Sequence, residues 1–251
     1  MIVRALIRVF IVTLGVALAL GLSACASPGP GTAGGEVVQS LPQKSGLQLT
    51  YSTFNAYNNE PRATVRQMFG PAGSRIEGMD YEAPAEGGFT VDRARTVNRV
   101  LDAQGDLVRL ERTDGSSVTY DPPMRVLPVP LRPGTRFRQT LSAQESDGSP
   151  PRKVIVAGYV GGWENVKVPA GEFRALRIVR DSWLGDHALT RTQTQRSEVD
   201  WYSPEIGAVV RSEENSLHED RMTSVGDSGQ PLIRRGDWLR WELRSVERKG
   251  V

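Results

Sequence analysis

The stretch NVKVPAGEFRALRI, residues 165–178, decides the fold class of this chain. It begins as a strand, reaches the turn residues Val-Pro-Ala-Gly, and returns through the apolar residues Phe173, Leu176 and Ile178. Pro169 fixes φ at the second position of the turn and Gly171 suits the fourth, which is the preference of a type I turn. The stretch therefore predicts a β-hairpin.

A second stretch, VDWYSPEIGAVVRSE (residues 199–213), repeats this arrangement. One strand ends at Trp201 and Tyr202, and the chain turns at Pro204. Gly207 supplies a permissive backbone before Val209 begins the return. This stretch also predicts a β-hairpin.

Apolar and polar residues alternate with a period of two in residues 47–52, 108–120 and 239–244, as half-buried strands require. Asp114-Gly115 tolerates the positive φ values of a hairpin turn. Only residues 91–101 fit either a strand or a helix. A twisted sheet with many strands tends to curl or close. We therefore expect an all-β fold, a single antiparallel meander curled into a barrel or half-barrel.

The motif V-P-A-G-E-F, followed by W-Y-S-P-E-I-G-A-V-V, resembles the TapB-like domain-of-unknown-function family of exported bacterial proteins. The resemblance covers about residues 134–217. It implies a periplasm-facing antiparallel β domain and no enzymatic activity. The alternative is that these residues only form turns.

The amino-terminal segment has the layout of a secretory signal. Arg4 and Arg8 precede an apolar run over residues 9–22, which is shorter than the roughly 20 residues of a membrane span. Residues 22–25, Leu-Ser-Ala-Cys, resemble the lipobox of bacterial lipoproteins. In that family the cysteine carries the lipid, and the peptide before it is removed.

Cys25 is the only cysteine, so an exported chain offers it no disulfide partner. We therefore expect residues 1–24 to be a cleaved lipoprotein signal peptide and Cys25 to be the lipid anchor. Ala26 and Ser27 differ from the aspartate that favours retention in the inner membrane of the enterobacterial lipoproteins that this segment resembles. We expect an outer-membrane protein that faces the periplasm, or a protein of the cell membrane if the host has a single membrane.

Residues 25–45 are rich in Gly, Pro, Ser and Ala and predict a flexible tether. Residues 46–251 are expected to form one antiparallel β domain. Without Arg4 and Arg8, 29 basic residues balance 29 acidic ones. This balance and the lack of a dense basic run argue against a nucleic-acid partner.

The segment GDSGQP around Ser228 resembles the nucleophile region of trypsin-like proteases. However, Gln230 replaces a glycine of that pattern, and His187 and His218 lie in neither the context nor the order of the protease histidine. Asp, Ser, Gly and Pro also form ordinary β-turns. We expect a turn at this position.

No other cluster predicts chemistry. His218, Glu219 and Asp220 are consecutive, so in a strand their side chains point to opposite faces and cannot jointly hold a metal. The same alternation argues against Glu213 and Glu214 as a catalytic pair. We expect no catalytic residue, metal or cofactor, and the sequence does not identify a small-molecule ligand.

Residues 190–200 are polar on both faces. They predict either an edge strand whose charges discourage aggregation, or a binding edge or polar concave surface to which a partner adds. The candidate binding residues are Arg191, Thr192, Thr194, Arg196 and Glu198.

Three functions are compatible with these features. The first is a lipid-anchored, periplasm-facing, non-enzymatic β domain that binds an envelope protein. The second is a carrier that holds lipid or lipoprotein acyl chains in an apolar half-barrel cavity, and the third is a serine hydrolase using Ser228. An exposed edge, a large apolar cavity, or a base within about 3 Å of the hydroxyl would distinguish them.

Overall fold

The computed structural model describes residues 36–42, 44–71, 73–80, 95–186, 191–225 and 230–248. The predicted signal peptide, the lipidation site Cys25, His187 and Ser228 lie outside these ranges. Residues 34–251 form one compact unit. Within the described ranges, no helix is long and apolar enough to cross a membrane.

The described residues form twelve strands. They are β1 (Leu47–Asn55), β2 (Pro61–Gly70), β3 (Gly73–Asp80), β4 (Arg95–Leu101), β5 (Leu107–Arg112), β6 (Ser117–Met124), β7 (Arg136–Glu145), β8 (Arg152–Val168), β9 (Gly171–Trp183), β10 (Arg191–Ser203), β11 (Ala208–Val225) and β12 (Gln230–Arg248).

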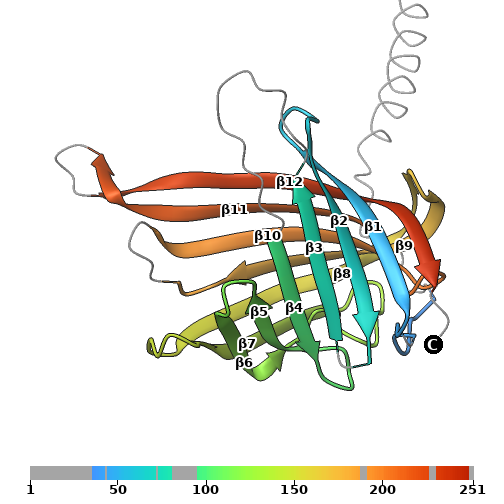
Figure 1. Cartoon of the computed structure of the whole chain (residues 1–251), viewed down its shortest axis with the longest axis horizontal. Coiled ribbons are helices and arrows are strands. Elements are labelled where there is room, and N and C mark those ends of the chain that lie inside the picture. Colours follow the sequence, from blue (N-terminus) through green and yellow to red (C-terminus); the bar gives the residue numbers. More distant parts are fainter. Residues whose placement is uncertain are drawn as a thin grey trace, which may run out of the picture. The chain divides into compact units, whose positions relative to one another are not determined.

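Each strand pairs antiparallel with the next, and β1 pairs with β12, so the sheet closes into a barrel (Figure 1). The closing pair runs from Leu47 opposite Arg248 to Asn55 opposite Leu239. The predicted all-β antiparallel meander is confirmed, in its closed form. Closure gives every strand two neighbours and removes the free edges that an open sheet would have.

The two hairpins that led to this prediction join β8 to β9 and β10 to β11, which are four of the five longest strands. β8 ends at Val168 and β9 begins at Gly171, so Pro169 and Ala170 form the turn. Gly207 has a φ of 76° directly before β11, a conformation that glycine adopts at little cost. The ambiguous residues 91–101 contain strand β4, and residues 91–94 lie outside the described part of the chain.

Strand length varies strongly around the barrel. β5 has 6 residues, whereas β11 has 18 and β12 has 19. The ribbon of β11 and β12 therefore extends beyond the short strands β3–β6 (Figure 1). At the end of the barrel opposite this ribbon, segments that connect the strands complete the structure.

Three apolar clusters fill the interior. The first joins β1, β2, β8, β9, β11 and β12 and is centred on Leu49, Ala175, Val210 and Leu243. The third lies between β6, β7 and β8. The second cluster differs because two of its buried residues, Leu127 and Leu131, come from the connection between β6 and β7.

We call residues 125–131 the plug. Leu131 is fully buried and packs with Val160, Leu176 and Tyr202, which belong to β8, β9 and β10. Gln139 fixes the start of the plug, since its side chain accepts from the Arg125 N–H and donates to the Pro123 carbonyl. The plug therefore packs on interior side chains of the barrel wall.

The amino-terminal residues 36–42 lie against the plug and the wall. Val38 and Leu131 exchange two backbone hydrogen bonds of 3.1 and 2.9 Å. Glu36 forms an ion pair of 2.7 Å with Arg174, and its carbonyl accepts from the indole N–H of Trp163. The expected flexible tether over residues 25–45 is therefore wrong for residues 36–42, because composition does not report these contacts.

Gly207 tests this packing. A Cβ at Gly207 would lie 2.4 Å from Cγ of Pro42, and its φ is positive. We expect Gly207→Ala to lower the free energy of unfolding by about 1–2 kcal/mol from the backbone alone, with the contact adding to this.

The matched control is Gly162→Ala, where an added Cβ meets nothing within 4 Å. Chemical denaturation of both variants measures the difference. Equal stability of the two variants would contradict the described position of Pro42 against the turn.

Candidate functional site

The polar stretch 190–200 is not an edge. Its described residues belong to β10, which pairs with β9 from Gln195 to Tyr202 and with β11 from Arg191 to Ser203. The edge-strand interpretation, and with it the addition of a partner strand, is therefore wrong for residues 195–200. The stretch is polar on both faces because one face meets solvent and the other meets a polar barrel interior.

Three of the predicted binding residues contact Asp186, which lies in the segment after β9. Thr194 donates its N–H and its hydroxyl to the carboxylate of Asp186, at 2.7 and 2.5 Å. Thr192 donates its hydroxyl to the Asp186 carbonyl at 2.9 Å, and Arg191 lies 3.6 Å from the carboxylate. Burial alone would raise the pKa of Asp186, but these hydrogen bonds lower it. Thr192 and Thr194 are buried and therefore fasten β10 to the segment after β9.

The other two predicted residues, Arg196 and Glu198, lie on the interior face of β10. Glu198 is paired with Arg180 of β9, and Arg196 with the buried Ser182. The two groups of predicted binding residues thus have different surroundings and do not form one surface.

Arg180 is the centre of a charged cluster inside the barrel. Its guanidinium bonds the carboxylates of Glu198 and Asp200, at 2.9 and 3.1 Å, and donates to the Val126 carbonyl of the plug. Ser212 donates its hydroxyl to the second oxygen of Asp200 at 2.7 Å. The side chains of all three ion-pair residues are at most 16% exposed, so this network ties β9, β10 and β11 to the plug.

Burial and charge act against each other in this cluster. Burial favours the neutral form of Glu198, but the charge and hydrogen bond of Arg180 lower its pKa. Burial together with the Glu198 charge raises the pKa of Asp200 despite Arg180. Burial also raises the pKa of Glu214, which follows on β11. The cluster therefore favours fewer negative charges than its three carboxyl groups would carry in water.

Arg99 of β4 adds a further positive charge. Burial and the Arg180 charge lower the pKa of Arg99, whereas Glu198 and Asp200 oppose that effect. Among the described residues, no ion pair or side-chain hydrogen bond involves Arg99. The positive charge of Arg99 is thus balanced only by carboxylates to which it is not hydrogen-bonded.

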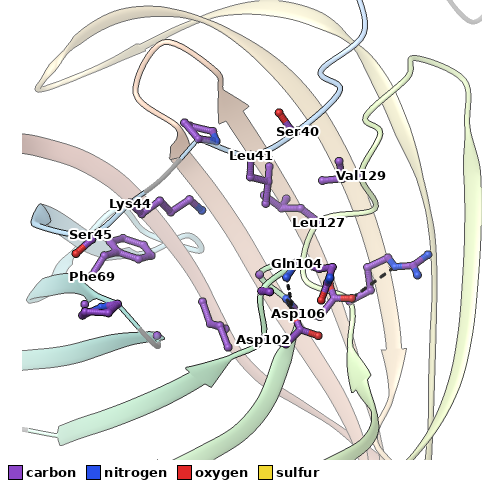
Figure 2. Close-up of a pocket in the computed structure, with 18 of the residues that line it drawn as sticks. Ser40, Leu41, Lys44, Ser45, Phe69, Asp102, Gln104, Asp106, Leu127 and Val129 are labelled. Carbon is purple, nitrogen blue, oxygen red and sulfur yellow. Dashed lines mark hydrogen bonds and ion pairs between the residues drawn. The ribbon is translucent and has the colours of Figure 1, made fainter.

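A pocket of about 430 Å³ opens next to this cluster, at the end of the barrel formed by the short strands (Figure 2). Four segments enclose it: residues 39–45, the β2–β3 turn, the β4–β5 turn, and the plug through Leu127 and Val129. Its volume lies in the range of small-molecule sites. The plug therefore forms one wall of the pocket.

Lys44 extends its amino group into this pocket, and the ring of Phe69 lies beside it (Figure 2). The amino nitrogen is 5.2 Å from the ring centroid, within the distance for a cation–π interaction. Burial and the Arg99 charge lower the pKa of Lys44 to about 8. The amino group of Lys44 has no ion pair or hydrogen bond with any residue that the structure describes.

The facing wall contains two carboxylates. Asp102 accepts from the backbone N–H groups of Gln104 and Asp106, each at 2.9 Å, and so forms the β4–β5 turn. Asp106 lies 3.9 Å from Arg125, and burial and the Asp102 charge raise its pKa. Both carboxylates are therefore engaged on their own side of the pocket.

The interior carries too many charged groups for the apolar half-barrel of an acyl-chain carrier. Arg180, Glu198 and Asp200 occupy the middle of the wall, and the mouth presents Lys44. No group of three or more His, Cys, Asp or Glu side chains with metal-binding geometry occurs in the described ranges. The arrangement can hold a polar or charged molecule by hydrogen bonds and charge.

Our sequence analysis missed Arg180, Asp200, Arg99 and Lys44. A signal for two of them was present: Arg180 follows Leu176 and Ile178 at intervals of two, and Asp200 precedes Tyr202 by two. These positions place both charges on the buried faces of adjacent strands. Arg99 and Lys44 gave no such signal, because Arg99 lies within the ambiguous segment 91–101 and Lys44 lies within a stretch whose composition is typical of linkers.

Comparison with known proteins gave distant matches. No protein-family model and no curated protein matches the chain, so the TapB-like resemblance has no support beyond the residues that suggested it. One similar solved structure is a "putative lipoprotein" from Parabacteroides distasonis ATCC 8503, with 11% identity, 85% of this chain and 100% of that chain covered, and a TM-score of 0.38.

Another is a "putative exported protein with YmcC-like fold" from Bacteroides fragilis NCTC 9343. It has 12% identity and a TM-score of 0.33, and the match covers 84% of this chain and 100% of that chain. At these scores neither structure assigns a role to a residue of this protein.

Removal of Arg180 tests the interior cluster. We expect Arg180→Met to lower the free energy of unfolding by about 3–5 kcal/mol at pH 7, because Glu198 and Asp200 are left buried without their cation. The deficit should shrink as the pH falls toward 4, since the two carboxyl groups then become neutral in the variant.

The control is Arg109→Met, which breaks the exposed ion pair with Glu111 and should cost no more than about 1 kcal/mol. Urea denaturation at both pH values measures the four stabilities. Similar losses for both variants, or a loss that does not depend on pH, would contradict the role given to Arg180.

Proposed function

We propose that this protein is a lipid-anchored, non-enzymatic binding domain of the bacterial envelope. In this proposal Cys25 carries the lipid, and the barrel faces the periplasm from the outer membrane. The motif Leu-Ser-Ala-Cys at residues 22–25 and the absence of a second cysteine in the sequence support the anchor.

The pocket is the observation that carries the binding function. It is open, has the size of a ligand site, and presents Lys44, whose amino group has no ion pair among the described residues, opposite Gln104 and Asp106. We propose that the envelope partner, a protein, inserts a group here and does not add a strand to β10. Binding uses only groups that are already in place, so no nucleophile or general base enters the proposal.

Acylation tests the anchor. Cells grown with radiolabelled palmitate should yield a labelled mature protein in the outer-membrane fraction, and Cys25→Ser should abolish the label. Ser27→Ala, two residues later, should retain it. Wild-type protein that carries no label would contradict the lipid anchor.

Site-specific photocrosslinking tests the pocket. A photoreactive phenylalanine analogue at the exposed, pocket-lining Gln104 should give a discrete adduct in intact envelopes. The same analogue at Asp147, in the exposed β7–β8 turn, should not. Equal adducts at both positions, or none at Gln104, would contradict binding at the pocket.

A further inference from the structure

We propose that the pocket binds an oxyanion, a phosphate or a carboxylate, at Lys44 with Arg99 behind it. This inference rests on the proposal that the pocket is the binding site, and it specifies the chemistry of the group that binds.

The first argument is the balance of charge around the pocket. Arg125 already lies beside Asp106, and Asp102 is used by the backbone of its own turn. Among the described residues, neither the Lys44 ammonium nor the Arg99 guanidinium has a hydrogen-bonded counter-ion, and Lys44 is the only charged residue on its own side of the pocket, between Gln39 and Gly73. A ligand that complements this wall is therefore negative.

The second argument is position. Gly73 lines the pocket, and a Cβ at Gly73 would touch the Arg99 carbonyl oxygen at 2.0 Å, so β4 passes directly behind this wall. Arg99 is paired with Ser74, which follows Gly73 and is buried, so the Arg99 side chain lies on the same face of the sheet as Ser74. In agreement with this position, the charge of Arg99 lowers the pKa of Lys44. Two partly buried cations that repel each other are stabilised by an anion that hydrogen-bonds at least one of them.

The third argument concerns size. The cavity of about 430 Å³ is much larger than an isolated phosphate or carboxylate group. The oxyanion is therefore one end of a larger molecule, whose remainder contacts Phe69, Leu127 and Val129. A protein side chain or carboxyl terminus, a lipid headgroup and a free metabolite share this chemistry.

Titration of Lys44 tests the site directly. The chain has four lysines, Lys44, Lys153, Lys167 and Lys249, so the protein labelled with 13C-lysine and purified in neutral detergent gives few Cε signals. Lys44→Arg assigns the signal that titrates near pH 8. Sodium sulfate replaces phosphate as the probe because its charge is constant over this pH range, and sodium acetate is the carboxylate probe.

We expect sulfate or acetate to raise the pKa of Lys44 by about one unit relative to sodium chloride of equal ionic strength, since a nearby anion favours the ammonium form. The Cε signal of Lys153, which does not line the pocket, should be the same with each salt. In Arg99→Gln the pKa of Lys44 should already be higher without anion, and its response should be smaller. If Arg99→Gln does not fold, the wild-type titration alone decides.

A Lys44 pKa that is the same in chloride, sulfate and acetate would overturn the proposal. Where sulfate acts, glycerol 3-phosphate and inorganic phosphate at pH 7 separate a headgroup-like ligand from a free ion. Tighter binding of either one supports the site, and binding of neither overturns it. If the photoreactive analogue at Gln104 gives no adduct but the pKa of Lys44 still responds to anions, the protein partner is refuted and the anion site is not.

Discussion

Closure of the barrel between β1 and β12 is the constraint on which the rest of the structure depends. Each strand pairs with two neighbours in the closed part of the sheet, and the protruding part of β12, residues 230–238, has no partner on β1. The side chains of each strand then have two environments, the solvent and the barrel interior. In an open sheet, polar residues such as Glu198 of β10 could lie at a solvent-exposed edge. Here Glu198 instead forms an ion pair with Arg180 inside the protein. In the closed part of the sheet, recognition uses an end of the barrel or side chains on its outer face.

The interior accommodates charge by pairing it. Glu198 and Asp200 share one guanidinium, which also binds the plug through the Val126 carbonyl. An isolated buried carboxylate would be strongly destabilising, whereas a bonded cluster costs far less. The same bonds attach the plug to the wall and so fix Leu127 and Val129, which line the pocket. The shape of the pocket therefore depends on ion pairs deeper in the barrel.

Most of the fold could be predicted because its signals are local. The turns at Pro169-Ala170 and Gly207, and the period-two alternation on both sides of them, are contained in short stretches of sequence. The site could not be predicted in the same way, because it joins segments that are distant in sequence: Lys44, the β4–β5 turn and the plug. Residues 36–42 show the limit of composition most clearly. They belong to a stretch that is rich in Gly, Pro, Ser and Ala as a whole, but Val38 and Glu36 are held by bonds to residues about a hundred positions away.

These contacts link the proposed anchor to the proposed site. Glu36 is fixed to the wall by Arg174 and Trp163, and residues 39–45 form one side of the pocket. Only ten residues lie between Cys25 and Glu36, and a fully extended chain spans at most about 3.6 Å per residue step. If Cys25 is lipidated, Glu36 thus lies within about 40 Å of the membrane surface. If Cys25 is lipidated, the segment between Cys25 and β1 would limit the distance of the barrel from the membrane, and the same segment carries Lys44. A pull on this segment would therefore act on the side of the pocket that Lys44 lines.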